Sequence, residues 1–154
     1  MPLAVETLSD EAFAPFGRVV DVPAREPDAV GDPWRWWASA AVLDHGERRC
    51  AVGYLEVEPG HATFDWAERH NESEEMVVPL GGELHVYVAA PEPEEFRVFR
   101  VRPGQAVILG KRVWHGAPLA RRPTSAIVLL AERTGELDTD KVSFEEIAVE
   151  EKEA

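Results

Sequence analysis

Two short polar stretches of the sequence carry side chains that could do chemistry. Residues 67–75 are dense in carboxylates and include His70, and residues 110–115 add two cations and His115. Imidazoles and carboxylates transfer protons near neutral pH, and both also ligate divalent metals. The sequence therefore predicts one site built from His70, His115 and one of the two glutamates that end the first stretch, Glu74 or Glu75.

The elements around these stretches decide whether they can meet. Turn signals recur every eight to twelve residues in this part of the chain, and Gly81-Gly82 has the composition of a hairpin connection. Many short strands at this spacing favour an all-β sandwich or barrel. In such a barrel, strands distant in sequence become neighbours, so the two stretches could face one cavity. The predicted strands are 61–69, 75–80, 83–90, 96–101, 105–109 and 124–131.

The two ends of the chain are less regular. A short helix is expected over residues 11–14, capped by Ser9 or Asp10. Three tryptophans at positions 34, 36 and 37 could wall a ligand pocket, or belong to the core or a dimer surface. Residues 145–154 form an acidic tail, read either as a strand with a frayed end or as a solvated terminus.

Length and charge exclude several classes of function. The chain has 154 residues and is expected to form one domain, residues 1–154. It holds 29 acidic and 16 basic residues, a net charge of −13, which opposes binding to phosphate backbones and anionic lipids. We therefore expect neither a nucleic-acid nor a membrane partner.

The cysteine content and the first residues of the chain indicate in which cellular compartment the protein is expected. Cys50 is the only cysteine, which excludes an internal disulfide. The sequence has no basic, apolar leader and no run of about 18 apolar residues, so a cytoplasmic location is expected.

The spacing of the two stretches resembles the cupin signature. In cupins, a His-x-His motif with a following Glu and Gly precedes a Pro-Gly turn and a final His. Here Gly82 ends the first motif, while Pro103-Gly104 and His115 supply the second. No register gives His-x-His, so the usual set of three histidines and one glutamate is incomplete. His70, Glu75 and His115 could still hold a divalent metal such as nickel, manganese, iron or zinc.

Within the cupins, the chain resembles the ureidoglycolate lyase family over roughly residues 7 to 133. The segments that carry the resemblance, in chain order, are Phe13-Ala14-Pro15-Phe16-Gly17, Glu68-Arg69-His70, Val78-Pro79-Leu80, Val88-Ala89-Ala90-Pro91, Pro103-Gly104-Gln105 and Val113-Trp114-His115. The resemblance implies a cupin-type double-stranded β-helix (a jelly-roll barrel) with one or two short helices, and a homodimer. It also implies cleavage of ureidoglycolate to glyoxylate and urea in purine (allantoin) breakdown.

Such a reaction assigns roles to the predicted residues. A base must take the hydroxyl proton and an acid must protonate the departing nitrogen. Glu75 (or Glu74) and His70 are candidate bases, and His115 is a candidate acid. The predicted substrate-binding residues are Arg69, Lys111, Arg112 and Trp114, whose cations could hold the substrate carboxylate.

Structural interpretations stay open beside these roles. His70 could be a solvent-facing turn residue, and His115 could be a buried core histidine. Two other functions also stay open. One is a metal-dependent cupin isomerase or oxygenase acting on another small carboxylate, and the other is a non-catalytic small-acid-binding cupin.

Overall fold

A computed structural model describes residues 1–60, 62–92 and 95–151. Regular structure in this part is almost entirely β, and neither helix is long enough to cross a membrane. The elements in chain order are β1 (Leu3–Thr7), α1 (Asp10–Phe13), β2 (Gly17–Val20), β3 (Ala29–Val30), β4 (Arg35–Trp36), β5 (Cys50–Val57), β6 (Thr63–Arg69), β7 (Glu75–Pro79), β8 (Leu84–Ala89), β9 (Arg97–Val101), β10 (Ala106–Leu109), β11 (Trp114–His115), β12 (Thr124–Ala131), α2 (Thr134–Leu137) and β13 (Asp140–Glu150).

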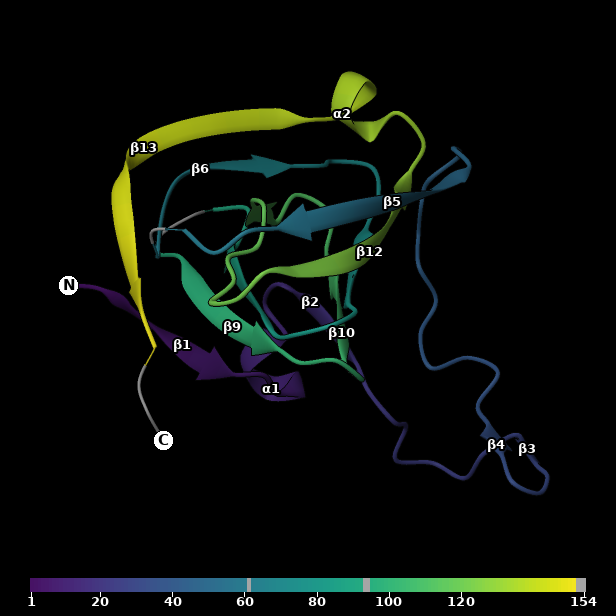
Figure 1. Ribbon diagram of the computed structural model, residues 1–154. Coiled ribbons are helices and arrows are strands. Elements are labelled where there is room, and N and C mark those ends of the chain that lie inside the picture. Colours follow the sequence, from purple (N-terminus) through teal and green to yellow (C-terminus); the bar gives the residue numbers. More distant parts are fainter. Residues whose placement is uncertain (61, 93–94, 152–154) are drawn as a thin grey trace.

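Two sheets make the body of the molecule. Six strands in the order β1-β13-β6-β11-β8-β9 close on themselves, because β1 pairs in parallel with both β13 and β9. Five strands in the order β2-β10-β7-β12-β5 form the second sheet, which is antiparallel throughout. In Figure 1, β13 and β6 lie side by side at the top of the view, and β5 and β12 lie side by side below them. This is the all-β barrel with short helices that the strand spacing predicts.

Strand β8 lies at the centre of the core and is buried on both faces. Leu84, Val86 and Val88 pack in a cluster that draws on both sheets. On the opposite face, Tyr87 stacks on Phe64 with ring centroids 3.8 Å apart. The alternation of a strand puts successive side chains on opposite faces, so these two sets lie on either side of β8.

The first helix closes one end of the core. Ser9 caps it, and its side chain accepts a hydrogen bond from the backbone N–H of Ala12 at 3.1 Å. Phe13 is fully buried and meets Phe99 edge-to-face at 5.2 Å. The predicted helix and its cap are therefore confirmed.

The sequence left two segments with open interpretations. Residues 145–150 of the acidic tail continue β13, which pairs with β6 and β1, so this part is the strand that was one of the two interpretations; residues 152–154 of the tail lie outside the described residues. The tryptophan cluster lies on an arm that leaves the body between β2 and β5 (Figure 1). Trp34 and Trp36 are more than half exposed, at 52% and 57%, and they do not wall the cavity described below.

Candidate active site

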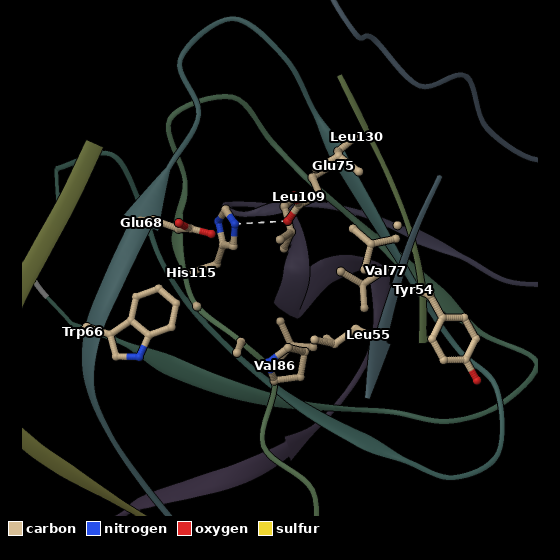
Figure 2. A pocket seen from close by; sticks show the side chains of 15 residues that line it. Tyr54, Leu55, Trp66, Glu68, Glu75, Val77, Val86, Leu109, His115 and Leu130 are labelled. Atoms are coloured by element: carbon tan, nitrogen blue, oxygen red, sulfur yellow. Dashed lines mark ion pairs between the residues drawn. The ribbon is translucent and has the colours of Figure 1, made fainter. Parts of the chain in front are cut away.

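A cavity of about 230 Å³ lies between the two sheets. Its polar side chains gather on one side, as Figure 2 shows: Glu68 from β6, His115 from β11 and Glu75 from β7. The opposite wall is aliphatic and includes Leu55 and Val86. The barrel thus holds a small cavity with one charged side.

Strand pairing explains why these side chains meet. His115 lies directly opposite Glu68 in the antiparallel pair of β11 and β6, and paired residues point to the same face. Residues 71–74 then turn the chain out of β6, so that β7 begins with Glu75 in the other sheet. Two sheets therefore contribute to one polar cluster.

The histidines and Glu75 are in close contact. The Nε2 atom of His115 lies 3.1 Å from Oε2 of Glu75, and Nε2 of His70 lies 3.6 Å from Oε1 of the same carboxylate. The two imidazole rings are 5.0 Å apart between centroids. Both histidines are about 5% exposed or less. The structure therefore brings together the three residues predicted as the catalytic set.

Backbone carbonyls orient both imidazoles. Nδ1 of His70 lies 3.0 Å from the carbonyl oxygen of Asp138, and Nδ1 of His115 lies 3.1 Å from that of Val113. A carbonyl only accepts hydrogen bonds, so each Nδ1 carries the hydrogen. The Nε2 atom of each ring therefore faces the carboxylate of Glu75. Neither Nε2 has a well-directed hydrogen bond among the described residues.

The charges of Glu75 and His115 are coupled. Burial by itself would raise the pKa of Glu75, but contacts with His115 and His70 outweigh burial and hold this pKa below the usual range. Burial would likewise lower the pKa of His115, and the contact with Glu75 reverses the effect and raises it. Without another cation present, the two groups form a buried ion pair.

Glu68, His70 and His115 could hold a metal ion. One ligand atom from each lies within 4.8 Å of the others. Two buried Nε2 atoms without directed partners and a carboxylate oxygen form the nitrogen and oxygen donor set that binds first-row divalent metals. The residues therefore fit such an ion. Figure 2 shows the imidazole of His115 between Glu68 and Glu75.

The residues predicted to bind the substrate carboxylate lie elsewhere. Arg69 pairs with Asp140 at 3.1 Å and stacks over Trp114 at 4.6 Å. Lys111 pairs with Asp44 at 2.6 Å. The exposed Arg112 has a left-handed φ of 67°, and its backbone N–H donates to the carbonyl of His70. None of these four predicted residues is among those that line the cavity.

Two features of the site were missed from the sequence. Glu68 was not among the predicted site residues, although the period of a strand places it on the same face as His70, two residues later. The aliphatic wall was missed because residues such as Val128 and Leu130 have the pattern of ordinary core positions.

Comparisons with known proteins identify the relatives of this chain. A family model described as ureidoglycolate lyase matches residues 1–151. Ureidoglycolate lyase 2 of Rhizobium meliloti (strain 1021) is 34% identical over 139 residues, covering 84% of this chain and 85% of the relative. A ureidoglycolate lyase of Brucella anthropi is 32% identical over 145 residues, covering 88% of this chain and 85% of the relative.

Solved structures support the fold. A dTDP sugar isomerase from Desulfovibrio desulfuricans G20 superposes with a TM-score of 0.56 at 16% identity, covering 85% of this chain and 87% of the isomerase. At this identity the likeness shows the fold alone, and it agrees with the predicted cupin-type barrel. The family match spans nearly the whole chain and the relatives share about a third of its residues, so the chain belongs to the ureidoglycolate lyase family.

Proposed function

We propose that this protein is a carbon–nitrogen lyase that cleaves ureidoglycolate to glyoxylate and urea in the cavity beside Glu75. Family membership supports the reaction. The observation that carries the proposal is the buried Glu75 carboxylate in contact with two imidazoles, 3.1 Å from His115 and 3.6 Å from His70. A buried, oriented carboxylate beside a cavity is the arrangement that proton transfer requires.

The reaction breaks the carbon–nitrogen bond and moves one proton from the hydroxyl oxygen to the departing nitrogen. The substrate carbon carries a carboxylate, a hydroxyl and the ureido nitrogen. Removing the hydroxyl proton forms the aldehyde of glyoxylate while the carbon–nitrogen bond breaks, and the nitrogen takes a proton to leave as urea. We assign Glu75 as the group that accepts the hydroxyl proton and returns it to the departing nitrogen.

The charge of the cavity supports a bound divalent cation. The substrate is an anion, yet Glu68 and Glu75 line the cavity and no lysine or arginine does so among the described residues. Two carboxylates in a low-dielectric pocket repel a third. We propose that Glu68, His70 and His115 hold nickel, manganese, iron or zinc there. When bound, the ion would supply the positive charge that fixes the substrate carboxylate and polarises its hydroxyl.

The direct contact between His115 and Glu75 favours a second assignment of roles. Without a cation, the His115 imidazole would be the acid that protonates the nitrogen, with Glu75 as the base. Metal analysis of the purified protein distinguishes the two. If the wild-type protein holds about one equivalent of metal and His115→Ala loses it, the metal-dependent assignment is supported. Full turnover by metal-free protein supports the assignment of His115 as the acid.

The deciding experiment is turnover itself. Purified protein incubated with ureidoglycolate is expected to release glyoxylate and urea in equal amounts, faster than the spontaneous reaction. Glu75→Gln should abolish the enzymatic rate, while Glu146→Gln, an exposed position on β13, should retain it. Binding of ureidoglycolate without turnover would contradict the proposal and favour a small-acid-binding cupin.

We also propose a homodimer. Exposed apolar side chains on β5, an edge strand of the five-stranded sheet, support it: Val52 and Tyr54 are 68% and 65% exposed. Trp34 and Trp36 on the arm add further apolar surface. Light scattering coupled to size exclusion tests this, with about twice the mass of 17.1 kDa expected. The cytoplasmic location stays a prediction.

A further inference from the structure

Most of the cavity wall is apolar, although urea is a polar product. Facing the polar cluster are side chains from four strands of the two sheets. These are Leu55 of β5, Val77 of β7, Val86 of β8, and Val128 and Leu130 of β12. Figure 2 shows Leu55, Val77 and Val86 across the cavity from His115 and Glu68. The cavity is therefore divided into a polar side and an aliphatic side.

A ureido group matches the polar side but not the aliphatic side. It carries three N–H bonds and a carbonyl, all of which need hydrogen-bond partners when buried. The ionisable side chains that line the cavity, Glu68, Glu75 and His115, lie where the substrate hydroxyl must react. Trp66 also lines the cavity but its indole can only donate a hydrogen bond, and Figure 2 shows the hydroxyl of Tyr54 pointing away from the cavity. The terminal NH₂ would then face aliphatic carbon. An apolar substituent in that position would instead gain from leaving water.

Gly53, which has no side chain, affects how much space is open beside the aliphatic wall of the cavity. Gly53 lies in β5, opposite Val128 in the strand pair. A Cβ built at Gly53 would lie 3.7 Å from Leu130 Cδ2 and 3.8 Å from Val128 Cβ, two residues of this wall. Glycine therefore leaves open the space beside the wall, where a substituent of the substrate could lie.

We propose that this site also takes N-acyl-2-hydroxyglycines whose acyl group is apolar, and cleaves them to glyoxylate and the corresponding carboxamide. The bond broken is the same as in ureidoglycolate, so the inference rests on the proposed function. The hydroxyl proton goes to Glu75, the carbon–nitrogen bond breaks with its electron pair on nitrogen, and the proton returns to that nitrogen. Atoms and electrons balance without an oxidant, a reductant or water.

Binding of two stable analogues tests the recognition step without catalysis. N-benzoylglycine and N-carbamoylglycine lack the hydroxyl, do not react, and differ only in the group that would face the aliphatic wall. Calorimetry on the purified protein is expected to show about tenfold tighter binding of N-benzoylglycine, as burial of an aromatic ring predicts. Equal or weaker binding of N-benzoylglycine would overturn the inference.

Two matched variants test whether the aliphatic wall causes the preference for N-benzoylglycine. Val128→Thr keeps the side-chain volume but adds a hydroxyl to the wall, so the preference for N-benzoylglycine should fall at least about threefold. Val52→Thr makes the same change on β5 at a position that is 68% exposed, and the preference should not change. The inference would be overturned if both variants lost the preference for N-benzoylglycine. It would also be overturned if neither variant lost it.

Turnover separates this inference from the proposed function. Glyoxylate release is measured from N-benzoyl-2-hydroxyglycine and from ureidoglycolate, each corrected for spontaneous decay. Cleavage of both, with the higher kcat/KM for the benzoyl compound, supports the inference. Cleavage of ureidoglycolate alone overturns it and leaves the proposed function intact. Cleavage of the benzoyl compound alone supports it and contradicts the proposed function, and cleavage of neither contradicts both.

Discussion

The contact between His115 and Glu75, 3.1 Å from Nε2 to Oε2, joins the two sheets of the barrel at the cavity. His115 belongs to β11 of the six-stranded sheet, and Glu75 begins β7 of the five-stranded sheet. Both side chains are buried, so the charge of each depends on the other. The site therefore exists only when the two sheets pack together.

Removing either partner of this contact should abolish catalysis. Glu75→Gln is nearly isosteric but cannot accept the hydroxyl proton, so kcat should fall by about 10²- to 10⁴-fold. His115→Ala should cause a comparable loss. Glyoxylate release provides the measurement, and circular dichroism checks that the fold survives. If both variants keep wild-type turnover, the assignment of roles is wrong.

Asp138 should position His70. Its carboxylate accepts hydrogen bonds from the backbone N–H groups of Asn71 and Glu72, at 3.0 Å and 2.9 Å, while its carbonyl holds Nδ1 of His70. In Asp138→Ala the carboxylate contacts are lost, and the free energy of unfolding should fall by about 2–3 kcal/mol, as measured in urea.

Activity should separate this positioning role from stability alone. At a temperature where Asp138→Ala is fully folded, we expect kcat to fall while KM changes little, and Asp138→Asn should recover part of the rate. Glu136→Ala is the control, because its ion pair with Arg133 is exposed and should contribute less than about 0.5 kcal/mol. Unchanged kcat in folded Asp138→Ala would exclude the positioning role.

Gly116→Ala should destabilise the protein strongly. A Cβ at Gly116 would clash with the hydroxyl oxygen of Tyr87, which is buried and donates to the carbonyl of Trp66 at 2.7 Å. Because the tyrosine has no room to move, we expect a loss of about 3 kcal/mol or more in chemical denaturation. Gly135→Ala, where a Cβ meets nothing within 4 Å, should be neutral or slightly stabilising.

Glu83 should make stability depend on acid pH. Burial alone would raise the pKa of Glu83, but hydrogen bonds with His85 and Arg100 outweigh it and lower this pKa. The ionised form therefore stabilises the fold above the unfolded-state pKa, about 4.3, and this contribution is lost as the pH falls through the lower folded-state value.

Urea titrations between about pH 5 and pH 3 test this, with Glu83→Gln expected to show a shallower loss of stability than the wild type. The difference should stay below about 1 kcal/mol, since the Glu83 side chain is 36% exposed and water screens it. Glu146→Gln removes an exposed carboxylate with no ion pair among the described residues and should keep the wild-type slope. Equal slopes in all three proteins would show that Glu83 contributes nothing.

The sequence by itself determined the local features. Ser9 caps a helix because its side chain can reach a free N–H group in the first turn. The hairpin predicted at Gly81-Gly82 is wrong, because the strands that these glycines connect, β7 and β8, lie in different sheets and pair with other strands. The alternation along β8 likewise follows from the period of a strand. The resemblance to a known family added the fold, and the spacing of the polar stretches indicated His70, His115 and one of Glu74 and Glu75. The structure selects Glu75, because Glu74 pairs with Arg18 instead.

Only the tertiary structure decided which groups share the cavity. Arg69, Lys111 and Arg112 lie beside the histidines in sequence, yet the acidic partners Asp140 and Asp44 hold the first and second of them outside it. Those partners are 71 and 67 residues away in the chain, so no local pattern reveals them. The register between β6 and β11 similarly placed Glu68 opposite His115. A side chain's direction can be predicted from its own strand, but its neighbours depend on how distant strands pair.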